Sequence, residues 1–169
     1  MNPAWDRLLR ILDEHGRELH AMFTRLTLRE DVAEDLLQDL CVRLLDADGF
    51  ARTDNPRGYA FRTAINLAFD WRRRRRRERS TRPLPDELEG ATVVPLSGLI
   101  RAEELEQTLD AVDDCLSLLQ RQVVVLHYLQ EQDYKEVAEQ LGKTEHQVRA
   151  HCCKAIQQLT ILLRSNGRE

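Results

Sequence analysis

The sequence predicts an all-α protein in which an acidic linker joins two small helical domains. Apolar residues recur at spacings of three and four through most of the 169 residues, and no stretch sustains the alternation typical of a β-strand. Prolines and glycines gather between residues 80 and 98, where the helical spacing stops. We therefore expect a first domain over residues 1–79, a linker over 80–100 and a second domain over 101–169.

The first two predicted helices cover residues 4–27 and 29–46. In the second, apolar residues recur at helical spacing from Ala33 to Leu44, so this face should pack against a core. The opposite face carries Glu34, Asp35, Gln38, Asp39 and Arg43, with Val42 exposed among them. By composition alone this is the solvated side of an amphipathic helix. Residues 47–54 should form a polar loop.

The third predicted helix, from Asn55 to Arg79, is the most informative stretch. Asn55 can cap it, and Pro56 at the first helical position loses nothing by lacking an N–H. Four apolar residues should face the core: Phe61, Ile65, Ala68 and Phe69. A polar stripe should lie along an exposed face: Arg62, Asn66, Asp70, Arg73 and Arg77. The helix ends in six consecutive arginines, Arg72–Arg77, which we call the arginine run.

Arginine suits phosphate because its planar fork donates two parallel hydrogen bonds to an anion. The arginine run therefore favours a helix that lies along a nucleic-acid backbone. The alternative is a solvated, self-repelling run of charge at a domain edge. Six guanidinium groups on less than two helical turns cannot all find nearby carboxylates, which favours the nucleic-acid interpretation.

The net charge of −4 would by itself argue against nucleic-acid binding, but the charge is unevenly distributed. Residues 1–79 carry 16 basic and 14 acidic groups, whereas residues 80–115 carry 2 and 9. Residues 116–169 carry 7 and 6. The acidity is thus concentrated in the middle of the chain, and the arginine run forms a local positive field.

The second domain contains a predicted helix-turn-helix. Tyr134–Leu141 is a short amphipathic helix, Gly142 provides the left-handed cap, and Thr144 with Gln147 forms a capping box that opens the next helix. The second helix should bury Val148, Cys152, Ala155, Ile156, Leu159 and Leu163. In DNA-binding proteins, the second helix of this motif enters the major groove. The alternative is a helical hairpin that closes a small bundle.

Several function classes are not supported. The four cysteines (Cys41, Cys115, Cys152 and Cys153) show no metal-binding spacing, so we expect free thiols and no metal or cofactor. No paired catalytic carboxylates, nucleophile with its base, or glycine-rich phosphate loop is present, so we expect no enzyme activity. The N-terminus lacks a signal sequence and no apolar run approaches a membrane span, which predicts a soluble cytoplasmic protein. His127 and Tyr128 should pack near the core.

Taken together, these motifs resemble an extracytoplasmic-function (ECF) sigma factor, the two-domain form of the bacterial sigma family. The resemblance covers nearly the whole chain. In region 2 it depends on AEDLLQDLCVRLL and NPRGYAFRTAINLAFDWRRR, and in region 4 on VVVLHYL and YKEVAEQLGKTEHQVRAHCCKAIQQL. It implies a non-enzymatic subunit that directs RNA polymerase to promoters. Ser117 stands where family members usually carry a proline.

The resemblance also implies partners and binding residues. The partners would be core RNA polymerase, through its beta-prime clamp and beta flap, promoter DNA and an anti-sigma factor, with no membrane insertion. The polymerase-binding set would be Asp35, Gln38, Asp39 and Val42. The minus-ten set would be Asp54, Asn55, Arg62, Asn66, Asp70, Arg72, Arg73, Arg74, Arg76 and Arg77, with an unstacked base of the non-template strand captured there. The minus-thirty-five set would be Lys143, Thr144, Glu145, His146, Gln147, Arg149, His151 and Lys154.

Two alternative functions belong to other classes. A sigma mimic would sequester an anti-sigma factor without touching promoters, and its DNA-binding face should be degraded. A stand-alone helix-turn-helix regulator would bind duplex DNA as a dimer and would not need the Asp35 and Gln38 surface. A nucleic-acid-processing enzyme is the least favoured. We expect no further domain after Glu169.

Overall fold

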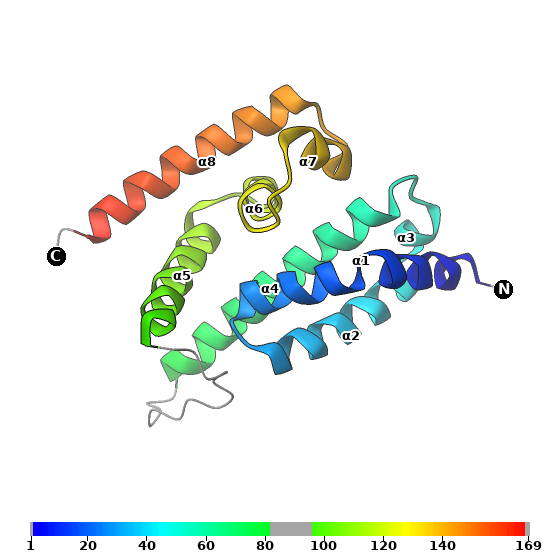
Figure 1. The fold of residues 1–169 in the computed structure, drawn as a ribbon, viewed down its shortest axis with the longest axis horizontal. Coiled ribbons are helices and arrows are strands. Elements are labelled where there is room, and N and C mark those ends of the chain that lie inside the picture. Colours follow the sequence, from blue (N-terminus) through cyan, green and yellow to red (C-terminus); the bar gives the residue numbers. More distant parts are fainter. Residues whose placement is uncertain (1, 82–95, 168–169) are drawn as a thin grey trace. The chain divides into compact units, whose positions relative to one another are not determined.

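The computed structural model describes residues 2–81 and 96–167, with side chains placed from residue 101 onward in the second stretch. The chain divides into two compact units, Met1–Val94 and Pro95–Glu169 (Figure 1). Every regular element in the described residues is a helix and none is a strand, which confirms the all-α prediction. The linker predicted for residues 80–100 lies largely outside the described residues. None of the described helices is long and apolar enough to cross a membrane.

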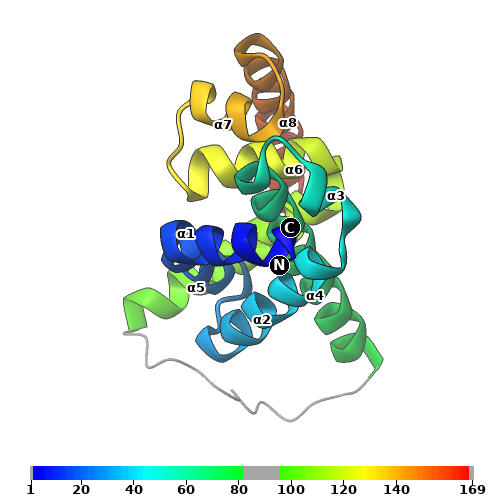
Figure 2. The ribbon, with the colours of Figure 1, turned by 90° about the vertical axis from the view of Figure 1, so that its right-hand side faces the viewer.

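The first unit is built from three long helices and one short one. They are α1 (Pro3–Thr27), α2 (Glu30–Asp46), α3 (Asp48–Arg52) and α4 (Pro56–Thr81). The three long helices contact one another in all pairs, and Figures 1 and 2 show them side by side. Large apolar side chains that are completely buried form the core between them: Leu19, Met22, Phe23, Leu26, Leu44, Phe61, Ile65 and Phe69. Burial of this apolar surface is the main force that holds the long helices together.

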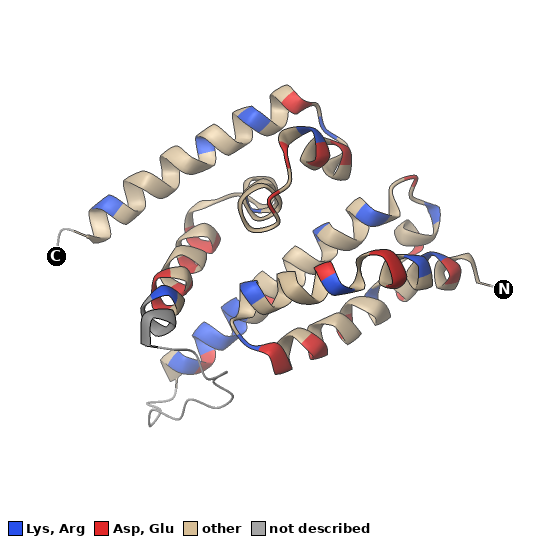
Figure 3. Cartoon of the chain, viewed as in Figure 1, with Lys and Arg blue, Asp and Glu red and all other residues tan. Residues whose placement is uncertain are grey.

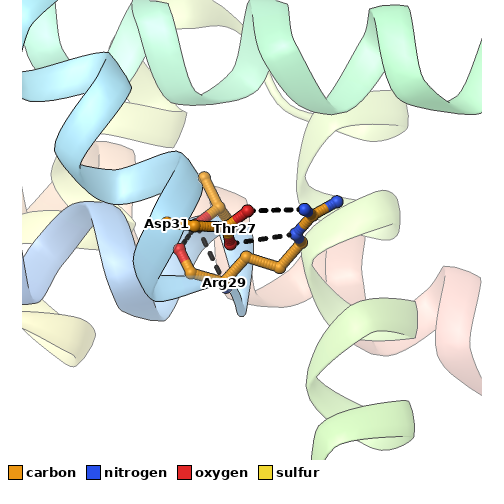
Figure 4. Close-up of polar contacts among 3 residues, drawn as sticks. All are labelled: Thr27, Arg29 and Asp31. Carbon is orange, nitrogen blue, oxygen red and sulfur yellow. Dashed lines mark hydrogen bonds and ion pairs between the residues drawn. The ribbon is translucent and has the colours of Figure 1, made fainter. Parts of the chain in front are cut away.

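Side-chain hydrogen bonds stabilise the turn between α1 and α2 (Figure 4). Leu28 adopts the left-handed conformation with φ 60° and ends α1. The Thr27 hydroxyl donates to the Phe23 carbonyl oxygen at 2.7 Å and accepts from the Arg29 backbone N–H at 3.3 Å. The Arg29 guanidinium then donates to both carboxylate oxygens of Asp31, at 3.2 and 2.6 Å. These hydrogen bonds lower the pKa of Asp31 below its ordinary value.

The helix α3 departs from the sequence prediction, which placed a loop over residues 47–54. The reason is Phe50, whose ring is completely buried and packs on Tyr59 with ring centroids 5.9 Å apart. Burying this ring draws the backbone around it into the unit. The carbonyl oxygens at the end of α3 are then satisfied from α1, because Arg7 donates to those of Phe50 at 3.1 Å and Thr53 at 2.6 Å.

The second unit contains α5 (Leu96–Cys115), α6 (Leu118–Val124), the π-helix η1 (Val125–Leu129), α7 (Tyr134–Leu141) and α8 (Glu145–Asn166). Helix α5 begins at Leu96, so residues 96–100 are helical where the sequence predicts linker. Helix α8 contacts α5, α6 and α7, and its buried side chains close the core. Arg121 on α6 forms an ion pair with Asp113 on α5 at 3.1 Å. Ser117 caps α6, and a reciprocal bond from Gln120 completes a capping box.

Candidate nucleic-acid interface

The start of α4 is fixed by two side-chain caps. The Asn55 Oδ1 atom accepts from the Gly58 N–H at 2.9 Å, and the Thr53 hydroxyl accepts from the Asn55 N–H at 3.1 Å. The predicted role of Asn55 as a cap is therefore confirmed. Because this amide oxygen is already bonded, the exposed residue Asp54 is the more accessible of the two loop residues assigned to DNA binding.

The polar stripe of α4 is less exposed than its spacing predicts. Arg62, Asn66, Asp70 and Arg73 are only half exposed, and Arg77 alone in the stripe is fully exposed. Arg62 lies back on its own helix, since its Nε donates to the Gly58 carbonyl oxygen at 3.2 Å. The stripe is partly covered because α4 contacts α1, α2 and α3. Its accessible end is the C-terminal one.

Arg72, which the resemblance places in the minus-ten set, is buried. Only 2 % of this residue is accessible, and its guanidinium donates to the Leu26 carbonyl oxygen, 46 residues earlier, at 3.0 Å. Arg72 continues the buried face of α4 that includes Ile65 and Phe69, at positions i+7 and i+3. It attaches α4 to the end of α1 and is not accessible to DNA.

The rest of the arginine run reaches solvent to different degrees. Arg74 and Arg77 are exposed, whereas Arg73, Arg75 and Arg76 are half exposed. The Arg75 guanidinium lies over the Trp71 ring, 5.2 Å from its centroid. Figure 3 shows basic residues concentrated in the C-terminal half of α4. Five of the six arginines of the run are therefore at least partly accessible to a ligand.

A groove lies between α2 and the C-terminal half of α4. It has a volume of about 230 Å³ and is lined by Arg43, Asp70, Arg73, Arg74 and Arg77. Asp70 forms an ion pair with Arg73 at 3.4 Å. We call this feature the α2–α4 groove. The sequence pattern predicts that Arg43 lies on the exposed face of α2, but spacing within one helix does not show which other helix lies beside it.

The exposed face of α2 agrees with its sequence pattern. Asp35, Gln38 and Asp39 are exposed, and 57 % of the apolar residue Val42 is accessible. An exposed valine within an acidic surface contributes nothing to the core of this unit. That surface is therefore available to a partner.

The second unit contains the predicted helix-turn-helix. Gly142 ends α7 with φ 63° and ψ 36°, in the left-handed conformation that glycine adopts without strain. The Thr144 hydroxyl accepts from the Gln147 N–H at 3.2 Å, and the Gln147 side-chain oxygen accepts from the Thr144 N–H at 3.0 Å. The predicted glycine turn and capping box are confirmed. Val148 and Cys152 are buried beneath the start of α8.

The residues assigned to base recognition lie where α8 begins. The exposed ones are Lys143, Thr144, Glu145, His146, Gln147, Arg149 and Lys154, and His151 is half exposed. Gln147 uses its carbonyl oxygen in the capping box, so bidentate pairing with adenine would require that bond to break. Arg149 is held on two sides. It pairs with Glu145 at 3.6 Å and lies over the Tyr134 ring, 5.1 Å from its centroid.

Beneath this helix, side chains from η1, α7 and α8 form a polar cluster. His127 stacks on Tyr134 with ring centroids 4.3 Å apart, and the Tyr134 hydroxyl lies 3.7 Å from Cys152 Sγ. Burial and the Cys152 thiol raise the pKa of Tyr128 to about 12. Tyr128 is nevertheless half exposed, so the expectation that it packs near the core is wrong. The described residues contain no group of side chains that could hold a metal ion.

The C-terminal half of α8 is also more exposed than predicted. Ile156 and Leu163 were expected to face inward, but 37 % and 40 % of their surfaces are accessible. Leu159 is the only buried residue between positions 156 and 166. The apolar face of α8 therefore has its full packing only over its first four turns.

Two family models match the chain, one for each unit. The model of sigma-70 region 2 matches residues 11–78, and that of sigma-70 region 4 matches residues 107–159. These matches together span more than two thirds of the chain, and they include α2, most of α4, α7 and the first two thirds of α8. The two units thus define a sigma factor, a class of non-enzymatic transcription initiation factors. The chain belongs to the sigma-70 family, in its two-domain extracytoplasmic-function form.

A solved structure shows a similar fold, and a second one is reported beside it. CnrH, in complex with the cytosolic domain of CnrY, is 17 % identical, and the match covers 96 % of both chains with a TM-score of 0.53. The sigma factor RpoE from Bartonella quintana, in complex with the anti-sigma factor NepR, is 21 % identical. That match covers 92 % of this chain and 95 % of RpoE, with a TM-score of 0.49. No curated protein sequence matches the chain.

Proposed function

We propose that this protein binds core RNA polymerase, directs it to promoters with two specific elements, and helps to melt the minus-ten region. The observation that carries the proposal is the arrangement of region 2. There the exposed acidic surface of α2 and the basic C-terminal half of α4 belong to one rigid helical unit. A polymerase subunit can thus be held beside a DNA strand without any further protein.

The polymerase contact is assigned to Asp35, Gln38, Asp39 and Val42 of α2. Their side chains are exposed although the helix is firmly packed, which suits a preformed docking surface. Charged groups of such a surface guide association, and the apolar Val42 contributes area that a partner can bury. We assign the contact to the beta-prime clamp, and that of region 4 to the beta flap.

The DNA contacts are assigned to both units. Asp54, Asn55, Arg62, Asn66, Asp70, Arg73, Arg74, Arg76 and Arg77 would bind the minus-ten strand, and Arg72 is withdrawn from this set because it is buried. The start of α8 would enter the major groove at the minus-thirty-five element. The residues assigned to this contact are Lys143, Thr144, Glu145, His146, Gln147, Arg149, His151 and Lys154. An accessible basic face favours this proposal over a sigma mimic, whose DNA-binding residues should be lost.

We further propose regulation by an anti-sigma factor. CnrH is bound by the cytosolic domain of CnrY in its solved structure, and its fold is similar to that of this chain. A partner that covers α2 or the start of α8 would block the surfaces assigned here to polymerase and DNA. The exposed apolar residues Val42 and Ile161 provide area for such a partner.

The first test is transcription in vitro with bacterial core polymerase on fragmented genomic DNA, followed by sequencing of transcript 5′ ends. New start sites that share two upstream elements are expected only when the protein is present. Polymerase binding without new starts would indicate a protein that does not recognise promoters. Absence of both would favour the mimic and remove the proposed function.

The second test addresses α2. Asp35→Lys and Asp39→Lys, made singly, should weaken binding to core polymerase roughly tenfold, because a reversed charge at a complementary interface adds repulsion. Asp13→Lys is the matched control, since Asp13 is an exposed carboxylate on α1. Equal affinities for the three variants, measured with labelled protein, would exclude α2 as the docking surface.

A further inference from the structure

We propose that the α2–α4 groove is a binding site for a single phosphate group, and that Arg43 is one of its ligands. Its phosphate would come from the promoter strand, a part of the inference that rests on the proposed function. Arg43 belongs to α2, whereas the other basic residues of the groove belong to α4. The site therefore exists only because the two helices pack together.

The charge balance of the groove favours an anion. Asp70 is its only acidic residue and pairs with Arg73, which leaves three further guanidinium groups around the same space. In the part of the chain that the structure describes, no carboxylate forms an ion pair with Arg43, Arg74 or Arg77. All three are exposed. Like charges repel when they converge without a counter-ion, so a bound anion would relieve that repulsion.

The ligand chemistry follows from the donors. Guanidinium groups donate pairs of hydrogen bonds in a plane, which matches two oxygens of one phosphate. A run of arginines on a single helix spreads its donors around the helix axis. Arg43 changes this arrangement because it approaches from a second helix, so donors surround the groove from both sides. A carboxylate offers two oxygens in one plane, whereas a phosphate accepts from several directions.

The structure favours a nucleic-acid strand as the source of this phosphate over a small free ligand. Three of the lining arginines are exposed, so the groove is open along its length and not closed around one molecule. The basic side chains also continue beyond the groove to Arg76 and Arg79 on α4. A strand could occupy the groove with one phosphate and continue past it with the next.

The position of Arg43 connects two of the surfaces assigned above. It lies one helical turn after Asp39, so both residues are on the same side of α2. Arg43 would thus contact DNA at the edge of the polymerase-binding surface. The strand and the polymerase would meet at this helix, and binding of one would position the other.

The anion site is tested first without DNA or polymerase. Pyrophosphate is titrated calorimetrically into the full-length protein at low salt. Arg43→Ala should weaken binding roughly tenfold, because charge-assisted hydrogen bonds are lost. Arg43→Lys should bind with intermediate affinity, and Asp70→Asn should bind more tightly since it removes the one negative charge. The control, Arg10→Ala, makes the same charge change on an exposed residue of α1 and should match the wild type.

Equal pyrophosphate affinities for Arg43→Ala and Arg10→Ala would overturn the proposal. The source of the phosphate is then tested with polymerase holoenzyme on a promoter fragment. Arg43→Ala should reduce the dependence of log affinity on log salt by about 0.7 to 0.9, the contribution of one phosphate. An unchanged slope, with pyrophosphate binding that requires Arg43, would overturn the assignment to DNA. If no holoenzyme forms, the proposed function fails while the pyrophosphate result still decides whether the site exists.

Discussion

The two units place their candidate DNA-binding side chains by different means. In the first unit, α4 is positioned by contacts between residues far apart in sequence, such as Arg72 with Leu26, 46 residues away. In the second unit, the start of α8 is positioned by devices that span three or four residues, including the capping box and the pair of Glu145 with Arg149. The basic end of α4 thus depends on long-range tertiary contacts, whereas the start of α8 combines packing on α5, α6 and α7 with local hydrogen bonds and ion pairs. Substitutions in the two units should therefore differ in how much stability or affinity they remove.

The largest effect should follow removal of the long-range anchor. Arg72→Met keeps much of the buried chain but removes the donor to Leu26, and should lower the free energy of unfolding of the first unit by about 2–3 kcal/mol. Both tryptophans, Trp5 and Trp71, lie in this unit, so urea unfolding followed by tryptophan fluorescence reports on it alone. Arg74→Met, at an exposed position, should change stability by less than about 0.5 kcal/mol. Similar losses for both variants would mean that Arg72 is not an anchor.

An intermediate effect is expected at the helix-turn-helix. Gly142→Ala adds a methyl group that meets no atom within 4 Å, so its cost comes only from the positive φ of 63°. That cost should be about 1 kcal/mol, and Gly142→Asn should lose less because asparagine tolerates this conformation. Hydrogen exchange of α7 and α8 amides should accelerate while the tryptophan transition stays unchanged. A shift of that transition would contradict the separation of the two units.

A smaller effect should appear in promoter recognition. Tyr134→Leu removes the ring beneath the Arg149 guanidinium, whereas Tyr134→Phe keeps the ring and loses only the hydroxyl near Cys152. The leucine variant should lose about two- to fivefold in affinity for the minus-thirty-five element, and the phenylalanine variant should match the wild type. The measurement is binding of holoenzyme to promoters with an intact or a scrambled minus-thirty-five element. Equal losses on both promoters would show that Tyr134 does not position Arg149 for recognition.

The smallest effect concerns the turn between α1 and α2. Arg29 lowers the pKa of Asp31 below its ordinary value of 3.8. The folded state thus binds the Asp31 proton less tightly than the unfolded state does. The carboxylate therefore stabilises the protein above pH 3.8. That contribution is lost as the pH falls through the lowered pKa. Because the Asp31 side chain is 58 % exposed, Asp31→Asn should lose at most about 0.5 kcal/mol at pH 7. Urea unfolding should show this difference at pH 7 and a progressively smaller one as the pH falls below 3.8. A constant difference would exclude titration as its cause.

The same contrast explains what the sequence could predict. The glycine turn and the capping box of Thr144 with Gln147 were predictable because each signal lies within a few residues of its effect. Within the arginine run all six residues are identical, so composition cannot show that Arg72 is buried. Its position at i+3 from Phe69 continues the apolar face and would have been the available signal. Helix α3 was missed because its one core residue, Phe50, is surrounded by polar residues.

Other features had no signal in the sequence. Nothing within α2 indicates that Arg43 lies beside α4, because that contact depends on how two helices pack. The assignments of individual residues to polymerase and DNA remain predictions.

The unbroken course of α4 has a consequence for spacing. At 1.5 Å per residue, about 33 Å separates Asn55 from Arg77 along the helix axis. In a helix, each inserted residue changes both the distance between two side chains along the axis and the angle between them. One inserted residue would turn the arginines by about 100° away from α2, whereas four would restore their direction but move them by about 6 Å. The length of α4 would therefore set how many nucleotides lie between the captured base and the α2–α4 groove.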